Sequence, residues 1–226
     1  MKQLIPRQNP LLQDHISNPL IDASKLATAQ HLSKSDRRTF IRRYVRGETA
    51  RQALTDWKPP LSLFGFTRGQ FSLVDLVISL LERSGPAELD LSTWTAASAD
   101  VSQLNQLLKA GKITKLRMLL DNTFVWRRPE IMKTVVELFG NNAIRVTENH
   151  AKFFTITTAD FAVTCKTSMN LNHNARFEDF DITCDPGLHE FLREMFDELW
   201  AQSFSQPWNR QQGRKLWKTH INPDGL

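Results

Sequence analysis

Strand-like and helix-like segments alternate along most of this chain, and this alternation restricts the fold more than any other feature of the sequence. From Leu61 to Trp200, short apolar runs typical of β-strands are separated by longer runs with apolar residues at helical spacing. Chains with this order form sheets whose strands are joined by crossover helices. The predicted fold is therefore α/β, a mixed and mostly parallel sheet flanked by helices. The expected strands are 61–66, 87–96, 113–121, 143–147, 151–158 and 161–169, and the expected helices are 70–85, 97–111, 128–140 and 185–202.

The sequence WKPP at residues 57–60 interrupts the chain and marks the predicted domain boundary. We expect an N-terminal extension with a basic helical segment at 1–58, the α/β domain at 59–203 and a basic tail at 204–226. Within the extension, helical spacing before and after Gly47 favours two short helices. They are either a helix-turn-helix element that reads DNA or a helix pair that only packs against the domain.

Positive charge is concentrated outside the predicted domain. The segment from Lys34 to Arg51 contains seven Lys or Arg residues and two acidic residues. The segment from Pro207 to His220 contains four Lys or Arg residues and no acidic residue. Basic arms favour a polyanionic partner, because phosphates that bind Lys and Arg release counterions. A solvated basic helix and tail would give the same counts. The candidate nucleic-acid-binding residues are Trp94, which could stack on a base or pack in the core, and Arg37, Arg38, Arg42, Arg43, Arg46, Arg214 and Lys215.

Composition excludes several classes of protein. No apolar run approaches the roughly 20 residues of a membrane-spanning helix. The first 20 residues contain prolines and no continuous apolar core, so they match neither a secretory signal nor a transit peptide, and the expected location is the cytoplasm. The two cysteines, Cys165 and Cys184, belong to no metal-binding or disulfide motif.

Polar residues gather where the last two predicted strands meet. His150 and Lys152 lie two residues apart at the start of one strand-like run, and Ser168 and Asn170 lie two apart at the end of the next. Residues two apart share one face of a strand, so the four side chains converge if these strands pair. Lys and Asn can donate hydrogen bonds to phosphate oxygens, and a neutral histidine can attack phosphorus. The pattern predicts a phosphodiester site that requires neither a metal nor a cofactor.

The order HxK followed by SxN resembles the signature of the phospholipase D superfamily, and the resemblance extends over about Leu61 to Trp200. The acid of that signature corresponds to Thr157 here, and its glycine corresponds to Thr167. The residues that match position by position are His150, Lys152, Ser168 and Asn170.

The resemblance also implies a role for each matched residue. The histidine is a nucleophile that forms a phosphohistidine, the lysine and the asparagine bind the phosphate, and the serine adds a hydrogen bond. An acid downstream of Asn170 orients the histidine, with Asp181 as first choice and Glu178 as second. Members of the family use two motif copies, one histidine serving as general acid. Because His150 is the only histidine here with a lysine two residues later, the resemblance implies a two-fold homodimer whose two copies of His150 face each other.

The leading functional hypothesis is a homodimeric nuclease that acts on DNA or RNA. The alternative is a nucleic-acid-binding or regulatory protein that keeps the phosphate site without turnover, which the threonine at position 157 favours. A phospholipid hydrolase is a third reading, weakened because no amphipathic entry surface is found in the sequence.

Overall fold

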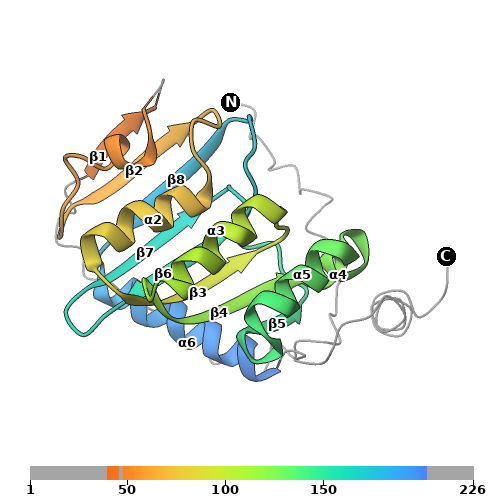
Figure 1. Cartoon of the computed structure of the whole chain (residues 1–226). Coiled ribbons are helices and arrows are strands. Elements are labelled where there is room, and N and C mark those ends of the chain that lie inside the picture. The colour runs from red at the N-terminus through yellow and green to blue at the C-terminus, as the bar shows by residue number, and fades with distance from the viewer. Residues whose placement is uncertain (1–39, 46–47, 203–226) are drawn as a thin grey trace, which may run out of the picture.

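The computed structural model describes residues 40–45 and 48–202, and within them the chain forms one eight-stranded sheet (Figure 1). The strand order across the sheet is β1-β2-β8-β7-β6-β3-β4-β5. The strands are β1 (Phe40–Tyr44), β2 (Ser62–Thr67), β3 (Ala87–Thr93), β4 (Ile113–Asp121), β5 (Ile144–Thr147), β6 (Phe153–Thr157), β7 (Ala162–Thr167) and β8 (Glu178–Thr183). The helices are α1 (Ala50–Ala53), α2 (Leu73–Ser84), α3 (Ser98–Lys109), α4 (Asn122–Arg127), α5 (Pro129–Phe139), the 3-10 turn η2 (Asn141–Ala143) and α6 (Pro186–Gln202).

The sheet is mixed, as predicted. The pairs β1/β2, β3/β4 and β4/β5 are parallel, whereas β2/β8, β8/β7, β7/β6 and β6/β3 are antiparallel. Parallel pairs therefore do not predominate, because β6, β7 and β8, the three strands that follow β5, lie in the middle of the sheet and pair antiparallel with their neighbours. Of these, β6 and β7 are joined by a short turn, which antiparallel pairing allows.

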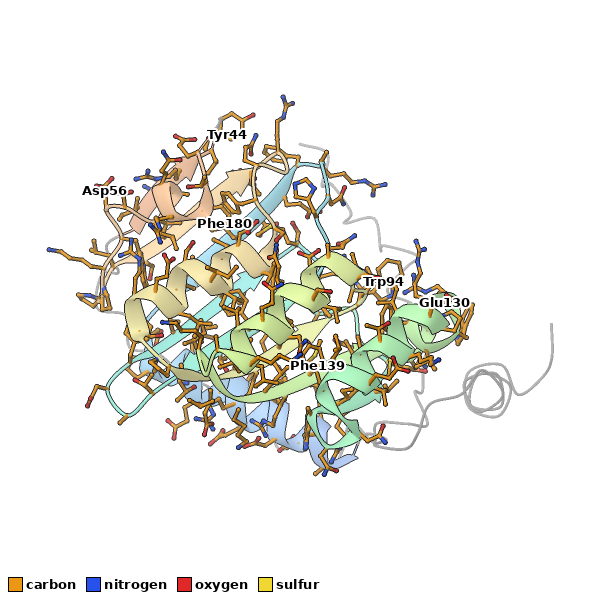
Figure 2. The ribbon with its side chains drawn as sticks, in the orientation of Figure 1. Tyr44, Asp56, Trp94, Glu130, Phe139 and Phe180 are labelled. Atoms are coloured by element: carbon orange, nitrogen blue, oxygen red, sulfur yellow. The ribbon has the colours of Figure 1, made fainter. Side chains whose placement is uncertain are left out.

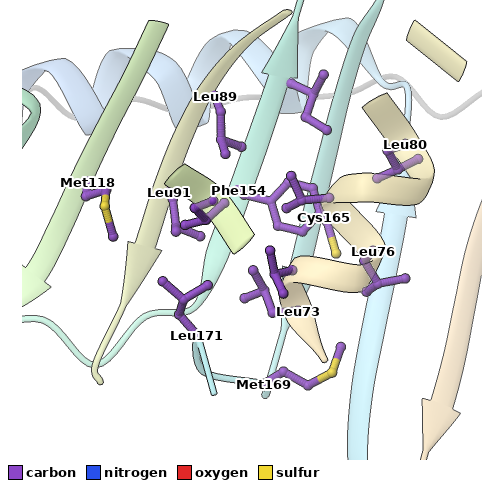
Figure 3. Packing of buried hydrophobic residues seen from close by; sticks show 14 of the residues in the cluster. Leu73, Leu76, Leu80, Leu89, Leu91, Met118, Phe154, Cys165, Met169 and Leu171 are labelled. Atoms are coloured by element: carbon purple, nitrogen blue, oxygen red, sulfur yellow. The ribbon is translucent and has the colours of Figure 1, made fainter. Parts of the chain in front are cut away.

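Helices cover both faces of the sheet (Figure 1). On one face α2, α3 and α5 pack over the main core, and Figure 3 shows Leu73, Leu76 and Leu80 of α2 against Phe154 and Cys165 of the sheet. The helix α6 covers the other face with a smaller cluster formed by Leu119, Phe153, Leu192 and Phe196. The fold class expected from the alternation of segments is confirmed.

Of the two short helices predicted around Gly47, the one after it is present as α1 (Ala50–Ala53), but the prediction of the one before it was wrong. Residues 40–44 form β1, which pairs in parallel with β2, because sheet pairing outweighs a weak local preference for helix. The buried side chain of Trp57 is 1% exposed and donates from Nε1 to the carbonyl of Leu61 at 2.7 Å. Residues 40–45 and 48–58 thus pack with the α/β domain, and residues 1–39 lie outside the described part of the chain.

The strand β8 was not expected. Its sequence, EDFDIT, looks like a polar link, but Phe180 and Ile182 are fully buried and point to the same face. β8 lies in the interior of the sheet between β2 and β7. Among the described residues, no helix has the length and apolar character needed to cross a bilayer.

Candidate phosphate site at the edge of the sheet

Loops from four neighbouring strands meet at one edge of the sheet. The strands β3 and β7 end there, and β6 and β8, which run antiparallel to them, begin there. His150 and Lys152 lie in the loop that enters β6, and Ser168 and Asn170 lie in the loop that leaves β7. The four residues were predicted at the start of one strand and the end of the next, and they lie in the loops just outside β6 and β7. The antiparallel pairing of β6 and β7 still brings the two loops to the same edge.

His150 and Lys152 are in direct contact. The Lys152 ammonium lies 3.0 Å from Nδ1 and 3.3 Å from Nε2 of the His150 ring, and it donates to the His150 carbonyl at 2.6 Å. The imidazole is exposed to solvent. Burial lowers the pKa of Lys152, and the carboxylates of Glu178 and Asp121 oppose this shift. The site therefore presents an imidazole and a partly desolvated cation side by side.

The loop that carries His150 is held by the buried side chain of Asn149. Its Nδ2 donates to Ser92 Oγ at 2.9 Å and to the Leu119 carbonyl at 3.2 Å, and its backbone N–H donates to Asp121 Oδ2 at 3.1 Å. These bonds tie the loop to the ends of β3 and β4. The sequence gives no sign of this role, because the partners come from strands far away in the chain.

Asn170 is oriented by its side-chain carbonyl. Its Oδ1 accepts from the backbone N–H of Trp94 at 3.2 Å and lies 3.4 Å from the hydroxyl of Thr93. Within residues 40–45 and 48–202 the side-chain N–H groups of Asn170 have no acceptor, so they can donate to a bound phosphate. The phosphate-binding role expected for Asn170 stays a prediction.

Ser168 is engaged in a different way. Its hydroxyl donates to Oε2 of Glu178 and accepts from the backbone N–H of Asp179 at 2.9 Å. Glu178 is the first residue of β8 and therefore lies at the edge where the loops meet. Ser168 acts here as a link between the β7 loop and the start of β8.

Asp181, the first choice for orienting His150, does not lie at this edge. It is three residues inside β8, roughly 10 Å along the strand from Glu178, and it forms an ion pair with Lys166 at 3.7 Å. Glu178 is the acid at the edge, and none of the described carboxylates bonds to His150. Thr157 lies at the far end of β6, where its hydroxyl is 3.1 Å from Nε2 of His189.

An arginine that the sequence did not single out completes this side of the site. The rings of Trp94 and His150 lie 5.4 Å apart, and the guanidinium of Arg127 lies 4.0 Å from the centre of the Trp94 ring. Arg127 Nε donates to Thr123 Oγ1 at 2.9 Å, and its Nη2 is buried with no partner among the residues described. Figure 2 shows Trp94 close to the start of α5. A role for Arg127 was not predicted from the sequence, because this residue follows β4 and is far in the sequence from the HxK motif.

The predicted basic residues divide into two groups. Arg42 is exposed on β1, and Arg43 donates to Asp56 at 2.8 Å. The others lie outside the described residues, namely Arg37, Arg38, Arg46, Arg214 and Lys215. In the described part of the chain, no group of three or more His, Cys, Asp or Glu side chains is arranged to hold a metal ion.

No protein-family model matches the sequence, and no curated protein matches it. Solved structures do show similarity. A phospholipase D family member, Nuc from Salmonella typhimurium, is 18% identical, with a TM-score of 0.49 over 63% of this chain and 95% of that chain. NucT from Helicobacter pylori is 11% identical, with a TM-score of 0.46 over 63% and 98%. Polyphosphate kinase from Porphyromonas gingivalis is 16% identical, with a TM-score of 0.43 over 66% and 27%. All three scores are below 0.5, so the function has to be inferred from the residues of this chain.

Proposed function

We propose that this protein is a phosphodiesterase that cleaves nucleic acid through a phosphohistidine at His150. One observation carries the proposal: an exposed imidazole lies 3.0 Å from the Lys152 ammonium, at the edge where Asn170 presents its side-chain N–H groups. These groups are the donors that a phosphodiester needs, because charge-assisted hydrogen bonds hold its nonbridging oxygens. A bound phosphate would take over the hydrogen bonds that Lys152 now directs at the imidazole.

The reaction proceeds in two displacements. A ring nitrogen of His150 forms a bond to phosphorus while the bond from phosphorus to the leaving oxygen breaks, and a general acid protonates that oxygen. Water then attacks phosphorus and gives a proton to the deprotonated general acid, while the bond from phosphorus to the His150 nitrogen breaks. Lys152 and Asn170 stabilise the negative charge on the phosphate oxygens in both steps.

The general acid comes from a second copy of the chain. His150 is the only histidine in an HxK motif, and none of the other described histidines lies beside it. A two-fold dimer with this edge at its interface places the imidazole of the second copy opposite the first. The roles of nucleophile and general acid are then shared between two identical residues.

Nucleic acid is the substrate class that the surrounding residues favour. The net charge is +5, and the Arg127–Trp94 stack beside His150 offers a cation and an aromatic ring to a nucleotide. Basic segments at both ends of the chain add further attraction for phosphates.

Cleavage of labelled DNA and RNA in EDTA tests the proposal. The wild-type protein is expected to cleave, and His150→Ala is expected to lose at least about 10³-fold in rate, because removal of a nucleophile abolishes the covalent route. His173→Ala is the matched control, since His173 is the other exposed histidine in the described part of the chain and contacts the Gly69 carbonyl. Full activity of His150→Ala would show that His150 is not the nucleophile.

A binding protein without turnover is the second candidate, and the contact between Lys152 and His150 favours it. The Lys152 ammonium lies within hydrogen-bond distance of both ring nitrogens of His150, at 3.0 Å and 3.3 Å. Because an ammonium only donates, this contact engages the nitrogen lone pair that would otherwise attack phosphorus. In the same assay, retention of intact oligonucleotide by the wild-type protein, with no cleavage, identifies this function.

A further inference from the structure

Four aromatic side chains form a patch on β1, β2 and the start of β8, which we call the aromatic patch (Tyr44, Phe64, Phe66 and Phe177). The Phe66 and Phe177 rings are stacked at 4.8 Å, Tyr44 lies 6.1 Å from Phe177, and Phe64 lies 5.1 Å from Phe66. Phe177 is 57% exposed and Tyr44 is 41% exposed. They are the only large hydrophobic residues exposed in the part of the chain that the structure describes, and both belong to this patch.

The alternation of β2 explains why the patch faces solvent. Leu63 and Gly65 point toward α2, and a Cβ atom at Gly65 would lie 2.4 Å from the ring of Phe180. Phe64 and Phe66 must then point to the opposite face. On that face α6 packs against β4, β6 and β7, through residues such as Leu119 and Phe153 (Figure 1). On this face, β1 and β2 lie beyond the strands that α6 packs against.

The aromatic patch lies on the same edge as the phosphate site. Phe177 directly precedes Glu178, whose carboxylate holds Ser168. The strands β2 and β6 are separated by β8 and β7, so three strand spacings, roughly 14 Å, lie between them. That distance corresponds to about four nucleotides of a stacked single strand.

We infer that the aromatic patch is a stacking platform for the bases of single-stranded nucleic acid bound at the phosphate site. This inference rests on the proposed function. Base faces are accessible in single strands, whereas in a duplex they are covered by neighbouring pairs. Exposed Arg42 on β1 and exposed Arg176 beside Phe177 supply positive charge for the adjoining phosphates.

Acidic residues near the aromatic patch strengthen the preference for a single strand. Asp179 pairs with Phe66 across β2 and β8, and Asp181 pairs with Phe64. Lys166 balances Asp181 at 3.7 Å. A duplex would bring a second row of phosphates against these carboxylates, but a single strand can place neutral bases over them.

Binding of short oligonucleotides, measured by fluorescence anisotropy, tests the platform. All proteins carry His150→Ala so that the oligonucleotide remains intact. Adding Phe177→Ala is expected to weaken single-stranded DNA binding by roughly 5- to 150-fold, the effect of losing one base stack, and to leave duplex binding unchanged. Phe177→Trp is the matched control and is expected to retain binding, because it preserves an aromatic face.

Four results would overturn the inference. The first is that the protein with Phe177 intact does not bind single strands, and the second is that Phe177→Ala binds them equally well. The third is that Phe177→Ala loses affinity equally for single strands and duplex, and the fourth is that Phe177→Ala loses the mass of a dimer in light scattering. The last result would assign the aromatic patch to contact with a second copy of the chain. The cleavage assay on His150→Ala remains independent, since failure of the platform leaves the chemistry of His150 untouched, and failure of cleavage leaves the binding result intact.

Discussion

Individual residues at the sheet edge owe their roles to the partners that surround them. Lys152 contacts the His150 ring, and the charges of Glu178 and Asp121 favour its protonated form, whereas Asn170 is fixed by the backbone of Trp94. Asp181 is a carboxylate, as an orienting residue would be, but it forms an ion pair with Lys166. Residue type alone therefore does not assign a role at this site.

The lowered pKa of Lys152 predicts an alkaline limit to phosphate binding. Burial disfavours the charged amine, so Lys152 loses its proton at a pH below its ordinary value of 10.5. Since only the protonated form attracts phosphate, oligonucleotide affinity is expected to fall as pH rises toward 10.5. Lys152→Arg keeps its charge over this range and should lose that part of the pH dependence. The same alkaline limb in both proteins would assign it to another group.

At the scale of elements, α6 is attached to the sheet by a few polar contacts set within its apolar face. Arg117 on β4 bonds to Asp90 on β3 through Nε at 2.7 Å and Nη2 at 2.6 Å, and it also contacts Asp197 on α6. Its guanidinium lies 4.9 Å from the centre of the Phe196 ring. This arginine thus links two strands and a helix.

The two acids that bind Arg117 are expected to differ in their effect on stability. The side chain of Asp90 is 7% exposed and that of Asp197 is 57% exposed. Asp90→Ala removes the buried partner of Arg117 and leaves it only the exposed Asp197, so it should lower the free energy of unfolding by about 3–5 kcal/mol. Asp197→Ala removes a solvated contact and should cost less than about 1 kcal/mol. Urea unfolding measures both, and equal losses would contradict the assigned burial.

The buried histidine of α6 predicts sensitivity to acid. His189 lies between the hydroxyls of Thr157 and Thr164, at 3.1 and 3.3 Å. Burial, assisted by Arg193, lowers its pKa, while Asp90 opposes the shift. The unfolded chain therefore binds a proton at a higher pH than the folded chain. Stability from this group is complete above its ordinary pKa of 6.5 and is lost as pH falls from there toward the lowered value.

Unfolding by urea at a series of pH values measures this effect. His189→Gln keeps a hydrogen-bonding side chain but does not titrate, so its stability should depend less on pH below 6.5 than that of the wild-type protein. Parallel curves for the two proteins would show that other groups cause the acid sensitivity.

For the whole molecule, the open question is how one HxK motif can supply both a nucleophile and a general acid. The sheet edge carries one His150 per chain, and the described residues add no second imidazole beside it. The proposed dimer meets this need by symmetry. Activity would then be a property of the pair of chains rather than of one chain.

Mixing experiments test the shared site. If each site needs His150 from both chains, a dimer of one wild-type chain and one His150→Ala chain lacks either the nucleophile or the acid. Co-expression with excess His150→Ala should therefore reduce the activity per wild-type chain in proportion to the mixed dimers formed. Tagged chains purified in two affinity steps provide the mixed dimer directly. Activity equal to half that of the wild-type dimer would show that each chain works alone.

Much of the fold was predictable because it follows from local patterns. Apolar spacing located α2, α3, α5 and α6, and capping residues agree with it: Ser72 and Asp75 form a capping box at the start of α2. The strand β8 was not predicted, because the acidic residues that alternate with the buried Phe180 and Ile182 make its sequence resemble a polar loop. The strand β1 was predicted as a helix. Both errors concern strands whose conformation is set by pairing within the sheet rather than by a local pattern.

The sequence by itself determined the alternation of strands and helices and the spacing of the His150–Lys152 pair, because both depend on residues close together in the chain. The tertiary structure alone decided that Glu178 lies at the site and Asp181 does not, that Asn149 holds the loop that carries His150 and that Arg127 stacks on Trp94. Each of these contacts joins residues ten or more positions apart in the chain. Strand order and register bring such segments together, and no local pattern encodes either.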